Sequence, residues 1–214
     1  MGVSLKKGQG VSLKKDGRTL SQVTIGLGWD VVKPKGLLNR LLKKGEDYAL
    51  DAICFMLNAN GHVADLGTLG DGKPTLVGGD IVFFNSLQHK SGAVKLTGDN
   101  RTGAGDGDDE QIIVNLSDIP DQYQRLVFIV AIYQGETRSQ NFGGVENAYI
   151  RAVDKSGAEL ARFDISGNTS FAAYHSITFA EVVRTDGSWE FKAIGNPHET
   201  DSLVTHLKLY LPKR

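Results

Sequence analysis

The 214-residue chain carries 24 lysines and arginines against 25 aspartates and glutamates, and 40% of its residues are hydrophobic. The formal net charge of −1 argues against a general nucleic-acid-binding protein, which needs a basic surface to displace counterions from phosphates. The single cysteine, Cys54, excludes a disulfide within the chain and a zinc site built from several thiolates.

Short runs rich in β-branched and aromatic residues recur along the chain, separated by glycine, asparagine and aspartate turns. Such runs, with little helical periodicity between them, predict a mainly all-β fold, an antiparallel β-sandwich. The run GVSLKK occurs twice, at 2–7 and 10–15, and alternates apolar with polar residues as half-buried strands do. The other predicted strands, in chain order, are 22–29, 48–57, 80–87, 111–116, 125–133, 147–154, 160–165, 176–184 and 189–195.

Two segments have helical character. KGLLNRLLKK (35–44) places its leucines on one face, and we expect a short helix that caps the sandwich, with a membrane or partner contact as the alternative. SDIPDQYQRL (117–126) has a serine N-cap and an early proline, which favour a short helical turn. The sandwich domain is predicted to span 1–195. The extension 196–214 alternates apolar and polar residues in LVTHLKLYL, which predicts a last strand or a partner-binding segment.

The densest charge lies in TGDNRTGAGDGDDEQIIVNL (97–116), where only Arg101 offsets the nearby acids. Two like charges about 4 Å apart repel by about 4 kcal/mol at the effective dielectric of a protein surface. Calcium would relieve this repulsion because it takes about 6–8 oxygen ligands with loose geometry, and the interspersed glycines let carbonyls turn inward. Magnesium ranks second because its geometry is stricter, and a transition metal would want histidine or cysteine. A solvated acidic turn at a sheet edge is the alternative.

Several motifs associated with binding or catalysis are excluded. Asp106 and Asp108 match the first and third positions of an EF-hand, but Gln111 and Ser117 stand where glycine and glutamate are required. GTLGDGKP (67–74) begins like a phosphate-binding loop but ends in proline, so we predict an exposed glycine-rich loop. The histidines are scattered, and no nucleophile, zinc-protease or paired-carboxylate motif is evident, so we expect that the protein is not an enzyme.

A set of motifs falls in one order along the chain: GLGWD (26–30), LDA (50–52), FFN (83–85), TGDN–TG–GDGDDE (97–110), QNFG to NAYIR (140–151) and DGSWEFKAIG (186–195). Together they resemble the TerD family of tellurite-resistance and general stress proteins, from the VSLKK start to about residue 195. The resemblance implies a calcium-binding β-sandwich that acts in stress response as a binding or scaffold module.

The resemblance also implies a set of calcium ligands, in which the acids of GLGWD and LDA reach the central loop from neighbouring strand ends. The matching positions are Asp30, Asp51, Asn85, Asp99, Asn100, Asp106, Asp108, Asp109 and Glu110. Two positions depart from the family pattern: Ala49 stands where the family commonly has an aspartate, and Ala104 where it often has a glutamate. Either one calcium site is weaker or Asp47 substitutes, and we expect at least one ion rather than a full pair.

The expected partners are calcium ions and, from the family context, other tellurite-resistance proteins, with a complex at the inner membrane face as one expected arrangement. The first residues contain no apolar core of signal-peptide length, and no apolar run reaches roughly 18 residues, so we expect a cytoplasmic protein. Two other functions remain open: a metal-dependent enzyme acting on a phosphorylated or nucleotide substrate, and a sandwich in which calcium is only a structural staple.

Overall fold

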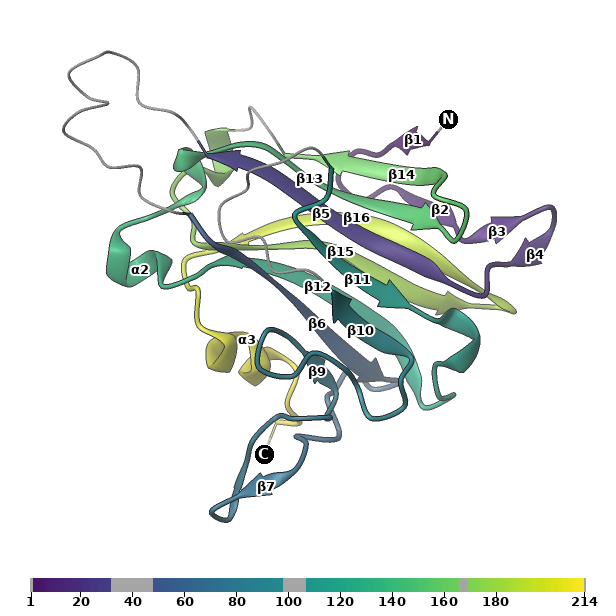
Figure 1. Cartoon of the computed structure of the whole chain (residues 1–214), viewed down its shortest axis with the longest axis horizontal. Helices are drawn as coiled ribbons and strands as arrows, with labels where there is room; N and C mark the ends of the chain where they lie inside the picture. The colour runs from purple at the N-terminus through teal and green to yellow at the C-terminus, as the bar shows by residue number, and fades with distance from the viewer. Residues whose placement is uncertain (1, 32–47, 98–106, 166–168, 214) are drawn as a thin grey trace.

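The computed structural model describes residues 2–31, 48–97, 107–165 and 169–213. Within these residues, two six-stranded sheets stack face to face (Figure 1). Every strand pair in the two sheets is antiparallel except β1 with β14. The predicted all-β sandwich is confirmed.

The strands of each sheet come from distant parts of the chain, as expected for a sandwich. The first sheet has the order β1–β14–β13–β5–β11–β10. Its strands are β1 (Val3–Ser4), β5 (Val23–Val31), β10 (Val94–Thr97), β11 (Glu110–Val114), β13 (Val145–Asp154) and β14 (Glu159–Asp164). The second sheet has the order β2–β16–β15–β12–β6–β9. Its strands are β2 (Gly10–Ser12), β6 (Leu50–Asn58), β9 (Ile81–Val82), β12 (Tyr123–Ile132), β15 (Ser176–Thr185) and β16 (Ser188–His198).

Several short elements lie outside the two sheets. They are the hairpins β3 (Lys14–Lys15) with β4 (Arg18–Thr19) and β7 (Leu69–Gly70) with β8 (Lys73–Pro74), the 3₁₀ turns η1 (Leu116–Asp118), η2 (Phe142–Gly144) and η3 (Thr169–Phe171), and the helices α2 (Gly135–Arg138) and α3 (Leu203–Leu209). The exposed loop predicted at 67–74 is the β7–β8 hairpin, which projects from the lower edge of the molecule (Figure 1). Among the described residues, no helix has the length and apolarity needed to cross a membrane.

Two hydrophobic clusters lie on opposite faces of the second sheet. On β6, Leu50, Cys54 and Met56 belong to the main core between the sheets. Ile53 and Phe55 belong to a second cluster on the outer face, which α3 and the segment before β9 cover. Because β6 is buried on both faces, its sequence is a continuous apolar run rather than an alternating one.

Part of the predicted strand 80–87 is instead a tight turn. Only Ile81–Val82 forms a strand, because Phe83 and Ser86 exchange backbone hydrogen bonds of 2.8 and 3.0 Å across a turn. Asn85 lies inside this turn, a position that asparagine favours.

The two predicted helical segments have different outcomes. The segment 35–44 lies outside the described residues. In 117–126 the helical turn is confined to η1 (Leu116–Asp118), and β12 already begins at Tyr123.

The prediction that the tail forms a last strand was wrong. β16 continues to His198, past the predicted boundary at residue 195, and the chain then forms helix α3. Ser202 caps this helix by accepting a hydrogen bond from the Thr205 N–H at 3.3 Å. Leu203 and Leu207 fall on one helical face and pack on the outer cluster, so the apolar residues of LVTHLKLYL follow a helical stripe as well as an alternation.

Candidate functional site

The described end of the acidic segment, residues 107–110, runs directly into β11. The Asp109 N–H donates to the Leu27 carbonyl at 2.7 Å, and Glu110 lies opposite Leu27 in the β5–β11 register. Three consecutive carboxylates are therefore held beside β5, the strand that contains the GLGWD motif.

Asp109 and Glu110 are buried and bind backbone N–H groups of two different sheets. Asp109 is 8% exposed, and its Oδ2 accepts from the Trp29 N–H on β5 at 2.8 Å. Glu110 is 3% exposed, and its Oε2 accepts from the Ala52 N–H on β6 at 2.5 Å. Since β11 and β6 belong to opposite sheets, the Glu110 side chain ties the two sheets together at this end of the sandwich.

Asp108 points to the outer face of the first sheet, where a cation meets it. Its Oδ1 accepts from Arg151 Nε at 2.8 Å and from the Tyr149 hydroxyl at 3.2 Å, and its Oδ2 accepts from Gln111 Nε2 at 3.1 Å. The hydrogen bond and charge of Asp108 raise the pKa of Arg151, and burial together with the Asp108 charge raises the pKa of the Tyr149 phenol.

These contacts change the electrostatic argument for a metal. Along the sequence only Arg101 stands near the acids, but β13 brings Arg151 to Asp108 through the fold. Backbone N–H groups of β5 and β6 likewise stabilise the charges of Asp109 and Glu110. Like-charge repulsion is therefore partly compensated by the protein itself for the described half of the segment.

Two glycines of GLGWD make room for this arrangement. A side chain at Gly26 would overlap the Asp108 carboxylate, and a side chain at Gly28 would overlap the Tyr149 ring. The Tyr149 hydroxyl in turn donates to the Gly107 carbonyl at 2.8 Å, so the ring lies across Gly28 and fixes the end of the acidic segment. Glycine is required here because other chain elements approach the β5 backbone closely.

We expect Gly28→Ala to lower the free energy of unfolding by about 1–3 kcal/mol, because the new methyl group displaces the Tyr149 ring from its packed position. Urea unfolding followed by tryptophan fluorescence measures this loss. The control is Gly70→Ala in the exposed β7–β8 hairpin. There the nearest atom to the added Cβ is the Thr75 methyl carbon, at 3.0 Å. Equal stabilities of the two variants would contradict the close-approach interpretation.

The remaining described candidates lie on other elements, and Asp30 and Asp51 are each one residue from an N–H group that binds Asp109 or Glu110. Asp30 is exposed and accepts from Asn147 Nδ2 at 2.7 Å, at an irregularity in the β5–β13 pairing. Asp51 precedes Ala52 on β6 and lines a pocket that also contains Ile53 of the outer cluster. Asn85 is exposed in the turn after β9. The structure thus brings Asp108, Asp109 and Glu110 together by sequence adjacency, and it distributes the other three over both sheets.

Asp99, Asn100 and Asp106 lie outside the described residues, as does Asp47. Across residues 2–31, 48–97, 107–165 and 169–213, no group of three or more histidine, cysteine, aspartate or glutamate side chains has the geometry of a metal site.

Sequence reasoning missed the contribution of β13. Asn147 holds Asp30, and Tyr149 and Arg151 hold Asp108. The available signal was the motif NAYIR itself, in which Tyr149 and Arg151 are two residues apart and therefore share one face of a strand.

Comparison with known proteins identifies close relatives over the whole chain. The sequence model of the TerD domain matches residues 1–210. Tellurium resistance protein TerX of Serratia marcescens is 59% identical over 99% of this chain and 100% of its own. General stress protein 16U of Bacillus subtilis (strain 168) is 40% identical over 93% of this chain and 92% of its own.

A solved structure has the same fold. The crystal structure of a homologue of telluride resistance protein (TerD) from Streptomyces coelicolor A3(2) superposes with a TM-score of 0.64 at 22% identity. It covers 90% of this chain and 99% of its own.

Proposed function

The chain belongs to the TerD family of tellurium-resistance and stress-response proteins, and from this premise we propose that it binds calcium and acts as a binding module rather than as an enzyme. The names of its relatives describe resistance and stress proteins, which supports a role in the same kind of response.

The observation that carries the calcium proposal is the pair of buried carboxylates, Asp109 and Glu110, at the C-terminal end of an acidic, glycine-rich segment. Their oxygens are hard ligands of the type that calcium prefers, and the segment contains neither histidine nor cysteine. Asp108 fits a metal less well because three protein donors already bind its oxygens. We rank Asp109 and Glu110 first among the proposed ligands because their carboxylates are buried at the end of this segment.

Three residues at this end of the sandwich have structural roles in the proposal. Glu110 joins β11 to β6, and Asp109 joins the segment to β5, so both hold the segment to the end of the sandwich. Arg151 holds Asp108 on the outer face and orients the chain entering the site. A bound calcium ion would supply the positive charge that the remaining acids require.

The other proposed ligands come from the family pattern. Within the acidic segment they are Asp99, Asn100 and Asp106, and elsewhere in the chain they are Asp30, Asp51 and Asn85. A segment tied down in this way would present one ordered end of the sandwich to a partner. We propose other tellurite-resistance proteins as partners, in the cytoplasm or at the inner face of the membrane.

A thermal-shift experiment tests calcium binding. We expect millimolar calcium to raise the melting temperature of the wild type, since a ligand at 100 times its Kd stabilises the folded state by about 2.7 kcal/mol. The double variant Asp99→Asn with Asp106→Asn should lose most of this shift while Asp109 and Glu110 keep the segment attached. Asp186→Asn, in the exposed turn at the far end of β15, serves as the control. A wild type without any calcium shift would contradict the proposal.

Affinity capture with and without a chelator separates a binding module from a structural staple. The binding module predicts partners that are lost when calcium is removed and also lost from the Asp99→Asn, Asp106→Asn variant. Identical partners under both conditions, combined with a normal calcium shift, would favour the staple.

A further inference from the structure

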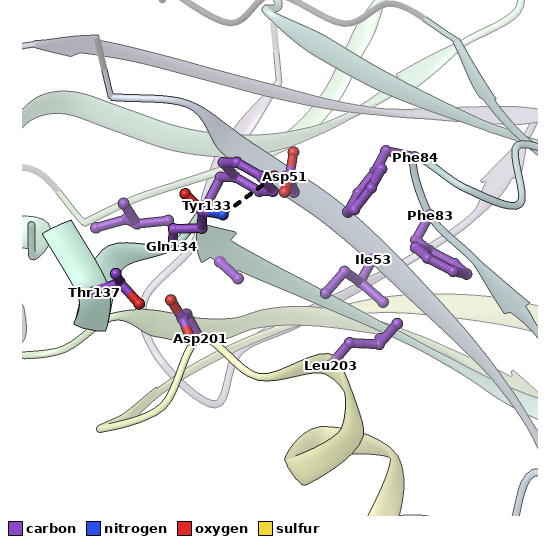
Figure 2. Close-up of a pocket in the computed structure, with 11 residues that line it drawn as sticks. Asp51, Ile53, Phe83, Phe84, Tyr133, Gln134, Thr137, Asp201 and Leu203 are labelled. Atoms are coloured by element: carbon purple, nitrogen blue, oxygen red, sulfur yellow. Dashed lines mark hydrogen bonds between the residues drawn. The ribbon is translucent and has the colours of Figure 1, made fainter. Parts of the chain in front are cut away.

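A pocket of about 270 Å³ opens at the outer face of the second sheet (Figure 2). Its walls come from the beginning of β6, the end of β12, the turn after β9, α2, the segment before α3 and the first residue of α3. Apart from Asp51, which matches the family pattern, its lining plays no part in the calcium proposal. Ligand pockets for drug-sized molecules span about 300–1,000 Å³, so this pocket suits a smaller molecule.

The lining divides into a polar and an apolar side. Figure 2 shows Thr137 and Asp201 on one side and Ile53 and Leu203 on the other. Ile53 and Leu203 are part of the outer hydrophobic cluster, so the apolar side is continuous with the protein interior. The arrangement suits a ligand with one polar end and a short hydrocarbon chain.

Two aromatic side chains at the opening are unusually exposed for their size. Phe84 is 45% exposed and Tyr133 is 38% exposed. Their rings are perpendicular, with centroids 6.1 Å apart. The Arg138 guanidinium lies 5.3 Å from the centroid of the Tyr133 ring, which shows that this ring accepts a cation on its face.

Both charged residues that line the pocket, Asp51 and Asp201, are acidic. Asp201 and Glu136 hold each other through backbone hydrogen bonds: the Glu136 N–H donates to Asp201 Oδ2 at 3.2 Å, and the Asp201 N–H donates to Glu136 Oε1 at 3.1 Å. Asp51 is the other carboxylate of the lining, and Glu136 stands beside Asp201 next to it. Arg138, in the same helix as Glu136, places a cation over the Tyr133 ring. The opening therefore attracts positive charge.

We propose that this pocket binds a small alkylamine in its ammonium form. The ammonium group lies at the polar side and donates to Asp201, and the hydrocarbon chain lies between Phe84 and Leu203. A carboxylate beside aromatic rings and an apolar wall recognises this combination, because the charge-assisted hydrogen bond and the apolar contact are made at once. A neutral molecule of the same shape gains only the second contact.

Amide NMR of the ¹⁵N-labelled protein in EDTA tests this site independently of calcium. We expect n-pentylamine to cause saturable shifts at Tyr133, Gln134 and Thr137. The neutral analogue n-pentanol should bind about tenfold more weakly or worse, the difference expected from one lost charge-assisted hydrogen bond. Equal binding of the amine and the alcohol, or the absence of saturable shifts at the pocket, would overturn the proposal.

Three variants and a third probe make the test specific. Asp201→Asn keeps an acceptor for the Glu136 N–H and should weaken pentylamine binding about tenfold, whereas Asp121→Asn, at the opposite end of β12, should leave it unchanged. Phe84→Ala should weaken it through the lost aromatic wall. Unchanged binding by Asp201→Asn would refute the ammonium contact. Tighter binding of N-acetyl-lysine methylamide than of pentylamine would refute a free amine and identify a lysine side chain of a partner as the occupant.

Discussion

Replacing Asp80 with alanine is expected to lower the free energy of unfolding by about 3–5 kcal/mol, the cost of leaving the donors around a buried charge without their acceptor. Asp80 is fully buried immediately before β9. Its Oδ1 accepts from the Tyr123 hydroxyl at 2.5 Å, and its Oδ2 accepts from the N–H groups of Ala64 and Asp65 at 2.8 and 2.9 Å. One carboxylate therefore attaches the segment before β9 to the beginning of β12.

The lowered pKa of Asp80 favours the ionised carboxylate that accepts these hydrogen bonds. Burial alone raises the pKa of a carboxyl group, but the hydrogen bonds from His89, Tyr123 and the two backbone N–H groups outweigh it and hold the pKa of Asp80 below its ordinary value. The His89 Nε2 lies 3.4 Å from Asp80 Oδ1, so the imidazole, the phenol and the carboxylate form one buried cluster. Burial and the Asp80 charge correspondingly raise the pKa of Tyr123.

Urea unfolding followed by tryptophan fluorescence measures the loss in Asp80→Ala. Asp80→Asn should cost less, because the amide keeps an oxygen that can accept from the two backbone N–H groups. Asp71→Asn, in the exposed β7–β8 turn, should change stability by less than about 0.5 kcal/mol. A loss below about 1 kcal/mol in Asp80→Ala would show that the cluster does not support the fold as described.

Stability is also expected to fall steeply as the pH falls from about 6.5 to about 4, and His206 is expected to account for about 3 kcal/mol of that fall. His206 lies in α3 and is fully buried. Its Nε2 is 2.8 Å from the Ser176 hydroxyl, and its ring centroid is 4.9 Å from that of His198. Burial, followed by the neighbouring His198, lowers the pKa of His206 to about 4.

The direction of this pH dependence follows from proton binding by the unfolded and folded states. An unfolded histidine binds a proton near pH 6.5, whereas the folded protein keeps His206 neutral down to about pH 4. Protonation therefore favours the unfolded chain throughout this interval, and the stability present above pH 6.5 is lost as the pH falls. Burial also lowers the pKa of His198, which adds to the loss in the same direction.

Urea unfolding at pH 7.5 and pH 4.5 measures this dependence. His206→Gln preserves a side chain that can bond to Ser176 but cannot titrate, so its stability should change less between the two pH values than that of the wild type. His62→Gln, in the turn after β6, should follow the wild type. If the wild type and His206→Gln lose the same free energy of unfolding between pH 7.5 and pH 4.5, His206 is excluded as the source of the pH dependence.

Most strands could be predicted because their residues show local patterns. β11 contains the β-branched run Ile112, Ile113 and Val114, and Asp186-Gly187 and Ser156-Gly157 mark turns between strands. Prediction failed where tertiary contacts select between two local patterns. The apolar residues of the tail fit both the two-residue period of a strand and the 3.6-residue period of a helix. Packing on the outer face of the second sheet, together with the Ser202 cap, selects the helix.

The same division holds for the candidate site. Adjacency in the sequence ensures that Asp108, Asp109 and Glu110 follow one another into a strand, but it does not say what each carboxylate contacts. Their partners Arg151, Trp29 and Ala52 come from three other strands. The motif NAYIR indicates that Tyr149 and Arg151 share a strand face, but a single sequence does not indicate which acid they contact.

By itself, therefore, the sequence determined the all-β class, the family and the place along the chain where negative charge accumulates, because these depend on residue type and short-range spacing. Only the tertiary structure decided which acids are compensated by the protein, that Glu110 links the two sheets, and that the tail is helical. Those features arise from packing between segments far apart in the chain, where side-chain burial and hydrogen bonding outweigh local preference.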